Sequence, residues 1–141
     1  MTKPLKVGVK SMVETARSQI TEYSATEAVA LAKDPKVLLV DIRDPRELAR
    51  DGKIPGALHA PRGMLEFWVD PDSPYFKPVF GEDRTFVFFC AGGLRSALTT
   101  KTLQDMGLAP VAHIEGGFAA WKAAGGAVED GAPKPQTKPQ T

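Results

Sequence analysis

The stretch TFVFFCAGGLRSALTTKTLQDMG (residues 85–107) indicates how this chain folds. Its first part, TFVFFC, is a short apolar run of the kind that forms a strand buried on both faces of a parallel sheet. The following RSALTTKTLQDMG has a helical pattern, with Gly107 near its C-terminal end. Between strand and helix lie two glycines and the only cysteine of the chain, Cys90. We therefore predict a strand–loop–helix unit with a cysteine at the strand end.

The same alternation extends over most of the chain. Strands are predicted at KVLLVDIR (36–43), IPGALHAP (54–61), TFVFFC (85–90) and PVAHIE (110–115). Helices are predicted at residues 8–18, 23–35, 44–52, 62–70, 95–107 and 116–126. This order predicts an α/β fold with a mostly parallel central sheet and helices on both faces. Ligands of such sheets bind beyond the carboxyl ends of the strands, where we expect Cys90.

Two of these helices carry N-terminal signals. Ser24, with Glu27 three residues later, fits a capping box. Asp44 fits an N-cap, with Pro45 at the first helical position. We interpret Glu47 as a capping residue of this second helix rather than as the partner of an arginine near the cysteine loop.

The composition suits one compact globular domain. The chain has 141 residues, of which 43% are hydrophobic and 25% charged. We divide it into an N-terminal helical extension (1–19), one α/β domain (20–128) and a C-terminal tail (129–141). The tail contains two KPQT repeats and few apolar residues, so we expect it to be disordered. A short interaction tail is the alternative.

The charge balance and the cysteine count exclude several classes of protein. The formal net charge is +1, which argues against nucleic acid or an anionic membrane as a partner. No apolar run approaches the roughly 18 residues of a membrane span, and the N-terminal residues lack an apolar signal core. One cysteine forms no internal disulfide and implies no oxidising compartment. We expect a cytoplasmic protein.

The loop after Cys90 has features that favour an anionic sulfur. Free N–H groups at a helix N-terminus and a nearby cation both stabilise a thiolate, and Arg95 closes the loop at the start of the helix. Gly92 and Gly93 permit positive φ angles, so that successive N–H groups can converge on one point. The alternative is an inert, buried cysteine that serves as a small core residue. The glycines and Arg95 favour a reactive thiolate.

Three segments then resemble the single-domain rhodanese family of sulfurtransferases. They are LLVDIRDPRELARDGKIPGALHAP (38–61), FFCAGGLRSA (88–97) and IEGGFAAWKAAG (114–125). The segments occur in the order that the family has, and the resemblance covers roughly residues 20–128. Two positions depart from the family's common pattern, since Lys53 stands where His is frequent and His59 where Asn is frequent.

The resemblance implies a role for each residue of the loop. Cys90 matches the nucleophile that holds sulfane sulfur as a persulfide, and Arg95 matches an arginine that contacts an anionic donor or acceptor. The loop whose backbone N–H groups stabilise the persulfide corresponds to Ala91, Gly92, Gly93, Leu94 and Arg95. No cofactor and no metal are implied.

The implied activity is sulfur transfer by double displacement. A small anionic donor such as thiosulfate would supply sulfur, and a thiol, or cyanide in vitro, would accept it. One alternative is a low-turnover persulfide carrier or sensor that delivers sulfur to a partner protein, and another is a non-catalytic module. Related folds that act on phosphate or arsenate have a longer loop, whereas four residues separate Cys90 from Arg95 here.

Residues outside the loop receive plainer interpretations. Arg62 follows the second predicted strand at the same edge as Cys90, and it is either a substrate-binding wall of the pocket or a solvated arginine. We interpret Asp41 and Arg43 as a buried or half-buried pair that holds a strand end. His59 and His113 are expected to be structural, and their spacing with one cysteine makes no metal site.

Overall fold

The structure is a computed structural model that describes residues 2–131. Its centre is a five-stranded parallel sheet with the strand order β1-β5-β4-β2-β3. The strands are β1 (Thr21–Tyr23), β2 (Val37–Asp41), β3 (Leu58–His59), β4 (Thr85–Phe89) and β5 (Val111–Ile114). The predicted α/β fold with a parallel sheet is confirmed. β1 was not predicted, because three residues that are exposed or only partly buried supply no periodic pattern.

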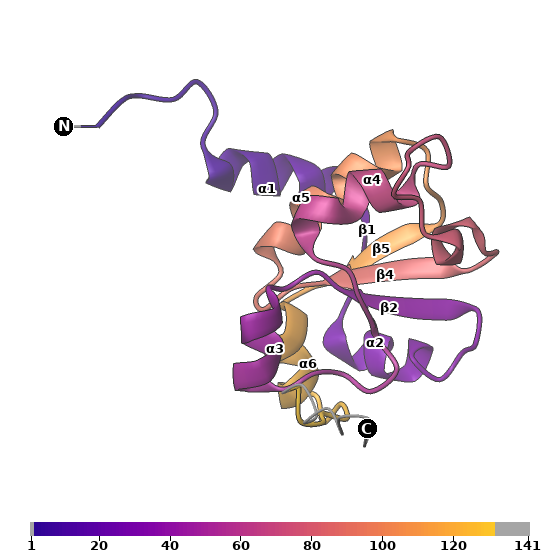
Figure 1. Cartoon of the computed structure of the whole chain (residues 1–141). Coiled ribbons are helices and arrows are strands. Elements are labelled where there is room, and N and C mark those ends of the chain that lie inside the picture. Colours follow the sequence, from indigo (N-terminus) through magenta and orange to yellow (C-terminus); the bar gives the residue numbers. More distant parts are fainter. Residues whose placement is uncertain (1, 132–141) are drawn as a thin grey trace, which may run out of the picture.

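Helices cover both faces of the sheet. The α-helices are α1 (Val9–Gln19), α2 (Ala25–Leu31), α3 (Pro45–Asp51), α4 (Leu65–Val69), α5 (Leu94–Asp105) and α6 (Gly117–Ala123). Two 3₁₀ helices accompany them, η1 (Arg62–Met64) and η2 (Pro78–Gly81). Figure 1 shows α1, α4 and α5 on one side of the sheet and α2, α3 and α6 on the other.

The central strands divide their side chains between two cores. On β4, Phe86 and Phe88 pack on the side of α4 and α5, while Val87 and Phe89 pack on the side of α2 and α6. Successive residues of a strand point to opposite faces, so both faces of β4 are apolar. Cys90 continues this alternation and joins the core beneath α4 and α5.

The predicted caps form in part. Ser24 and Glu27 make the complete capping box of α2. The side chain of Asp44 accepts a hydrogen bond from the backbone N–H of Arg46 and caps α3. The prediction that Glu47 caps this helix rather than pairing with an arginine was wrong in its choice, because the carboxylate pairs with Arg95, although a hydrogen bond with the backbone of Asp44 also acts on it.

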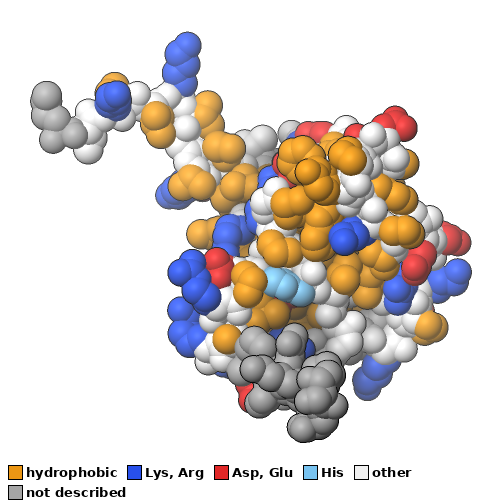
Figure 2. All heavy atoms as spheres, in the orientation of Figure 1, with side chains coloured by type: hydrophobic (Ala, Val, Ile, Leu, Met, Phe, Trp, Pro, Cys, Tyr) orange, Lys and Arg blue, Asp and Glu red, His pale blue; other side chains and the backbone are white. Residues whose placement is uncertain are grey.

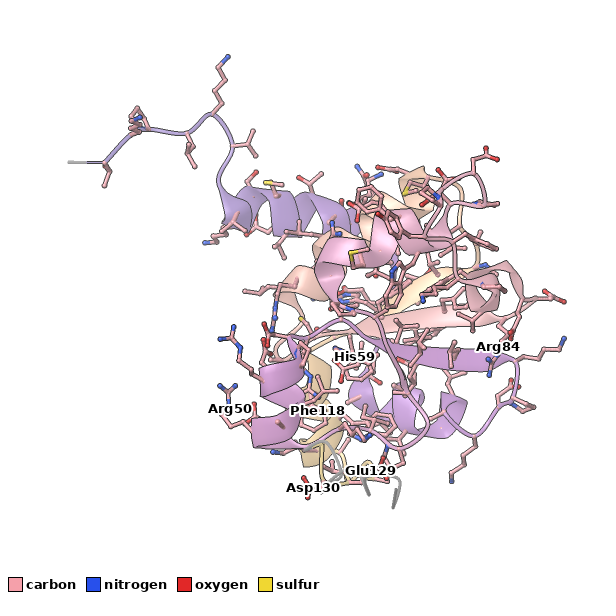
Figure 3. All side chains as sticks on the ribbon, in the orientation of Figure 1. Arg50, His59, Arg84, Phe118, Glu129 and Asp130 are labelled. Atoms are coloured by element: carbon pink, nitrogen blue, oxygen red, sulfur yellow. The ribbon has the colours of Figure 1, made fainter. Side chains whose placement is uncertain are left out.

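The elements near the two ends of the described chain contact different parts of the molecule. α1 packs against α5 through Val13 and Ala16. Near the other end, Glu129, labelled in Figure 3, pairs with Lys53 in an isolated antiparallel bridge. The KPQT repeats of the predicted tail lie outside the described residues, and the domain limits stay predictions. Between residues 2 and 131, no helix is both long and apolar enough to cross a membrane.

Candidate active site

Cys90 lies directly after β4, at the carboxyl edge of the sheet and below the first turn of α5. Cys90 is 1% exposed, and its Sγ accepts a hydrogen bond of 3.1 Å from the backbone N–H of Gly93. Gly93 is the N-cap of α5 and has a φ of 97°, a conformation that favours glycine. Gly92 stays outside the positive-φ region. One N–H group at the start of a twelve-residue helix therefore points at the sulfur.

Backbone N–H groups at the N-terminus of α6 bind the loop that follows Cys90. The backbone N–H of Phe118 donates to the carbonyl oxygen of Cys90 at 2.8 Å, and that of Ala119 donates to the carbonyl of Ala91 at 3.1 Å. Gly117 sits so close to this loop that a Cβ there would overlap the carbonyl oxygen of Cys90. A glycine at position 117 is therefore needed for contact between α6 and the loop.

Arg95 is engaged by a carboxylate from another part of the chain. Its two terminal nitrogens donate to both oxygens of Glu47, at 2.8 and 2.9 Å. The hydrogen bonds from Arg95 hold the pKa of Glu47 below its usual value, although burial opposes this. The hydrogen bonds to Glu47 likewise raise the pKa of Arg95, and the nearby Cys90 sulfur acts in the same direction. Arg95 therefore lies at the mouth of the site, already paired.

A row of polar side chains runs from Cys90 into the protein. The Sγ of Cys90 lies 3.6 Å from the hydroxyl of Ser96, which lies 2.9 Å from Nδ1 of His113. Nε2 of His113 lies 2.7 Å from Glu22, and Glu22 accepts a 2.8 Å hydrogen bond from Arg17. Sequence reasoning missed Ser96 and Glu22. Glu22 meets His113 because these residues are register partners in the β1–β5 pairing, and β1 itself was not predicted.

Burial and hydrogen bonding set the charges in this row. Burial lowers the pKa of His113, and the hydrogen bond to Glu22 opposes this effect. The pKa of Glu22 is also lowered: burial alone would raise it, but the hydrogen bonds from Arg17 and His113 outweigh burial. Glu22 is therefore an ionised carboxylate at neutral pH.

Asp41 and Arg43 form the predicted structural pair. Both side chains are buried, and Arg43 donates to Asp41 at 2.8 Å and to the carbonyl of Gly52 at 2.8 Å. The guanidinium carbon lies 4.1 Å from the ring centre of Phe118, and His59 donates from Nε2 to the carbonyl of Arg43 at 2.7 Å. Figure 3 labels Phe118 and His59. His59 thus helps to hold the end of β2.

Arg62 lies outside this cluster. Its guanidinium donates to Glu66 at 2.7 Å, within the turn that begins α4. Its side chain also lines a groove of about 360 Å³ together with Met12 of α1 and Leu98 of α5. Within residues 2–131, Arg62 has no hydrogen bond to the Cys90 loop, and its contact with a substrate stays a prediction.

This arrangement presents one sulfur atom to a helix N-terminus and a guanidinium, in a setting that favours negative charge. A family model for the rhodanese-like domain matches residues 24–124. The chain is 34% identical to a sulfurtransferase from Allochromatium vinosum over 104 residues, which are 74% of this chain and 87% of that protein. It is 30% identical to the human thiosulfate:glutathione sulfurtransferase over 104 residues, which are 70% of this chain and 90% of that protein.

A solved structure from Rhodopseudomonas palustris CGA009 is similar over almost the whole chain. The TM-score is 0.88 and the identity 60%, and the match covers 92% of this chain and 99% of that one. That protein is described as one of unknown function and as a possible tyrosine phosphatase. The family model spans well over half of the 141 residues, and the three motifs lie where the site is built. The chain therefore belongs to the family of rhodanese-like domains.

Proposed function

We propose that this protein is a sulfurtransferase that carries sulfane sulfur on Cys90. The observation that supports this most directly is the 3.1 Å hydrogen bond from the Gly93 N–H to Cys90 Sγ at the start of α5. A thiolate or a persulfide is stabilised by such a donor. The relatives named sulfurtransferases support the same class of reaction. A free cysteine that must stay reduced suits the cytoplasm.

The first half-reaction loads the cysteine. The Cys90 thiolate attacks the outer sulfur of thiosulfate and forms a new S–S bond, while the S–S bond of the donor breaks and its electron pair leaves with sulfite. Ala91, Gly92, Gly93 and Leu94 form the loop around the persulfide. Arg95 faces the anionic donor from the loop end, where it exchanges Glu47 for the donor's oxygens.

The second half-reaction unloads the cysteine. An acceptor thiolate attacks the outer sulfur of the persulfide, takes it as a new persulfide, and leaves Cys90 as a thiolate. Cyanide plays the same part in vitro and leaves as thiocyanate. The name of the human relative includes glutathione, which makes a small thiol the first acceptor to test.

Intact-mass measurement tests this proposal. Incubation with thiosulfate is expected to add the mass of one sulfur atom to the wild-type chain, and glutathione is expected to remove it again. Cys90→Ser is expected to gain nothing. A wild-type chain that gains no mass with thiosulfate, mercaptopyruvate or glutathione persulfide would show that the proposed activity is wrong.

A persulfide carrier that serves a partner protein is the second candidate, and an exposed aromatic pair favours it. Phe67 and Tyr75 are 51% and 57% exposed and pack edge to face, with ring centres 6.3 Å apart. Figure 2 shows hydrophobic side chains gathered over this part of the molecule, around α4. A stable persulfide together with slow thiosulfate:cyanide turnover would favour the carrier.

Phosphatase activity fits the loop less well. A phosphate presents three oxygens to its binding loop, whereas the loop here directs one N–H, that of Gly93, at the sulfur. Four residues between Cys90 and Arg95 also make a shorter cradle than the family's phosphate-binding relatives have. Hydrolysis of p-nitrophenyl phosphate that disappears in Cys90→Ser would contradict this ranking.

A further inference from the structure

A row of polar side chains, made of Ser96, His113 and Glu22, lies behind Cys90, and its first two members are buried. Ser96, in the first turn of α5, is 0% exposed, and His113, on β5, is 1% exposed. Burying polar groups costs free energy unless each finds a partner. Each group here has one, and the row ends on the sulfur of Cys90 at one side and on Glu22 at the other.

The hydrogen bonds in this row have a single consistent direction. An ionised carboxylate only accepts, so Nε2 of His113 carries a hydrogen and donates it to Glu22. In a neutral imidazole the other nitrogen then has no hydrogen, and Nδ1 accepts from the hydroxyl of Ser96. The Ser96 oxygen keeps its lone pairs for the thiol of Cys90, 3.6 Å away. From the Cys90 sulfur to Glu22, each group of the row therefore donates to the next one.

We propose that Ser96, His113 and Glu22 form a proton relay that removes the proton of the Cys90 thiol and stores it beside the thiolate. The S–H bond breaks and the sulfur keeps the electron pair. The Ser96 oxygen receives this proton and passes its own to Nδ1 of His113. The products are a thiolate and an imidazolium, and no other reactant is consumed. This inference rests on the proposed function, because the thiolate is the species that attacks the donor.

Carboxylates near His113 partly offset the cost of a proton on its ring. Burial lowers the pKa of His113 and Arg17 from α1 acts in the same direction, while Glu22 from β1 and Glu115 after β5 favour the imidazolium. Arg17 donates to both carboxylates, at 2.8 Å to Glu22 and 3.2 Å to Glu115. Two negative groups and one positive group thus surround the ring, and thiolate formation at Cys90 adds a third negative charge.

The roles of the three residues differ. Ser96 touches the reacting sulfur and passes the proton directly. His113 and Glu22 are positioning residues that act through Ser96. A merely structural row would hold β1, β5 and α5 together without any link between the ionisation of His113 and that of Cys90. That link is what an experiment has to detect.

The two histidines of the chain make the first test internally controlled. The ring signals of His113 and His59 are followed by NMR as a function of pH in the wild type and in Cys90→Ser. Loss of the thiolate is expected to lower the titration midpoint of His113 by about one pH unit or more. His59, which donates to the carbonyl of Arg43, is expected to titrate alike in both proteins. An unchanged His113 midpoint would overturn the relay.

The reciprocal test follows Cys90 when His113 is changed. It measures the ultraviolet absorbance of the thiolate as a function of pH. Cys90 is the only cysteine, and the Cys90→Ser protein serves as the blank at each pH. His113→Gln and Ser96→Ala are each expected to raise the pH at which the Cys90 thiolate forms by about one unit, whereas the matched change His59→Gln is not expected to change it.

Circular dichroism identifies any variant that fails to fold. In that case the NMR comparison of the wild type with Cys90→Ser still decides. Thiolate curves that coincide for wild type and His113→Gln contradict the relay. No sulfur donor is used, so these outcomes are independent of the mass experiment on the proposed function.

Discussion

Two arginine–carboxylate pairs lie at the same edge of the sheet and differ in burial. Asp41 and Arg43 lie at and just after the end of β2, with side chains 2% and 0% exposed. Glu47 and Arg95 join α3 to the start of α5, with side chains 19% and 44% exposed. In the interior, a charge that loses its partner has no water to replace it, whereas a partly exposed charge does. The buried pair, Asp41 and Arg43, therefore stabilises the fold. In the partly exposed pair, Arg95 is able to exchange Glu47 for another anion.

The largest expected effect comes from breaking the buried pair. Asp41→Asn leaves the guanidinium of Arg43 buried without its counter-charge, and we expect the free energy of unfolding to fall by about 3–5 kcal/mol. Urea unfolding measures this change. The same substitution at the exposed Asp44, which pairs with Arg46, is the matched control, and we expect a much smaller loss there. Equal losses at both positions would show that burial does not separate the two kinds of pair.

Removing Arg95 is expected to affect catalysis more than stability. Arg95→Ala deletes the cation at the mouth of the site, and we expect kcat/KM for thiosulfate to fall by about ten- to a hundredfold. The free energy of unfolding should change by less than about 1 kcal/mol, because the pair is partly exposed. Arg50→Ala, which removes an exposed arginine of α3 that pairs with Asp51, is the control. If Arg95→Ala kept full kcat/KM, Arg95 would have no part in donor binding.

The smallest effect is expected from Glu47. Glu47→Gln removes the carboxylate that competes with the donor for Arg95, and the KM for thiosulfate should fall by about two- to fivefold.

The same substitution tests how Glu47 contributes to stability as the pH changes. The pKa of Glu47 is lowered in the folded protein, so the carboxylate stabilises the fold at pH values above its ordinary pKa of 4.5. That contribution disappears as the pH falls through the folded-state pKa. The stability difference between wild type and Glu47→Gln, below about 1 kcal/mol at pH 7, should therefore vanish in acid. A difference that persists there would mean that the carboxylate charge is not its source.

Both arginine pairs show how far sequence reasoning reached. Asp41 and Arg43 are two residues apart at the end of an apolar run, so the prediction of a structural pair followed from local pattern, and it is confirmed. Glu47 and Arg95 are 48 residues apart, and nothing local distinguishes Glu47 from a capping glutamate. The choice of capping over pairing with an arginine was wrong, because the parallel sheet brings the start of α3 beside the start of α5, where Glu47 pairs with Arg95.

The row of polar side chains behind Cys90 was even harder to predict, because its members are far apart in the sequence. Cys90 and the glycines of its loop are recognisable because strand, loop and helix are contiguous. Ser96 looks like an ordinary helix residue, and Glu22 lies 91 residues from the histidine that it contacts. Only the pairing of β1 with β5 places Glu22 opposite His113.

The sequence by itself determined the alternation of strands and helices, the parallel sheet, and the cysteine loop at a strand end, because these follow from local periodicity and turn chemistry. The tertiary structure decided which charges and hydroxyls surround the sulfur. Those contacts depend on strand order and helix docking, which join residues far apart in the chain, and no short stretch of sequence records them.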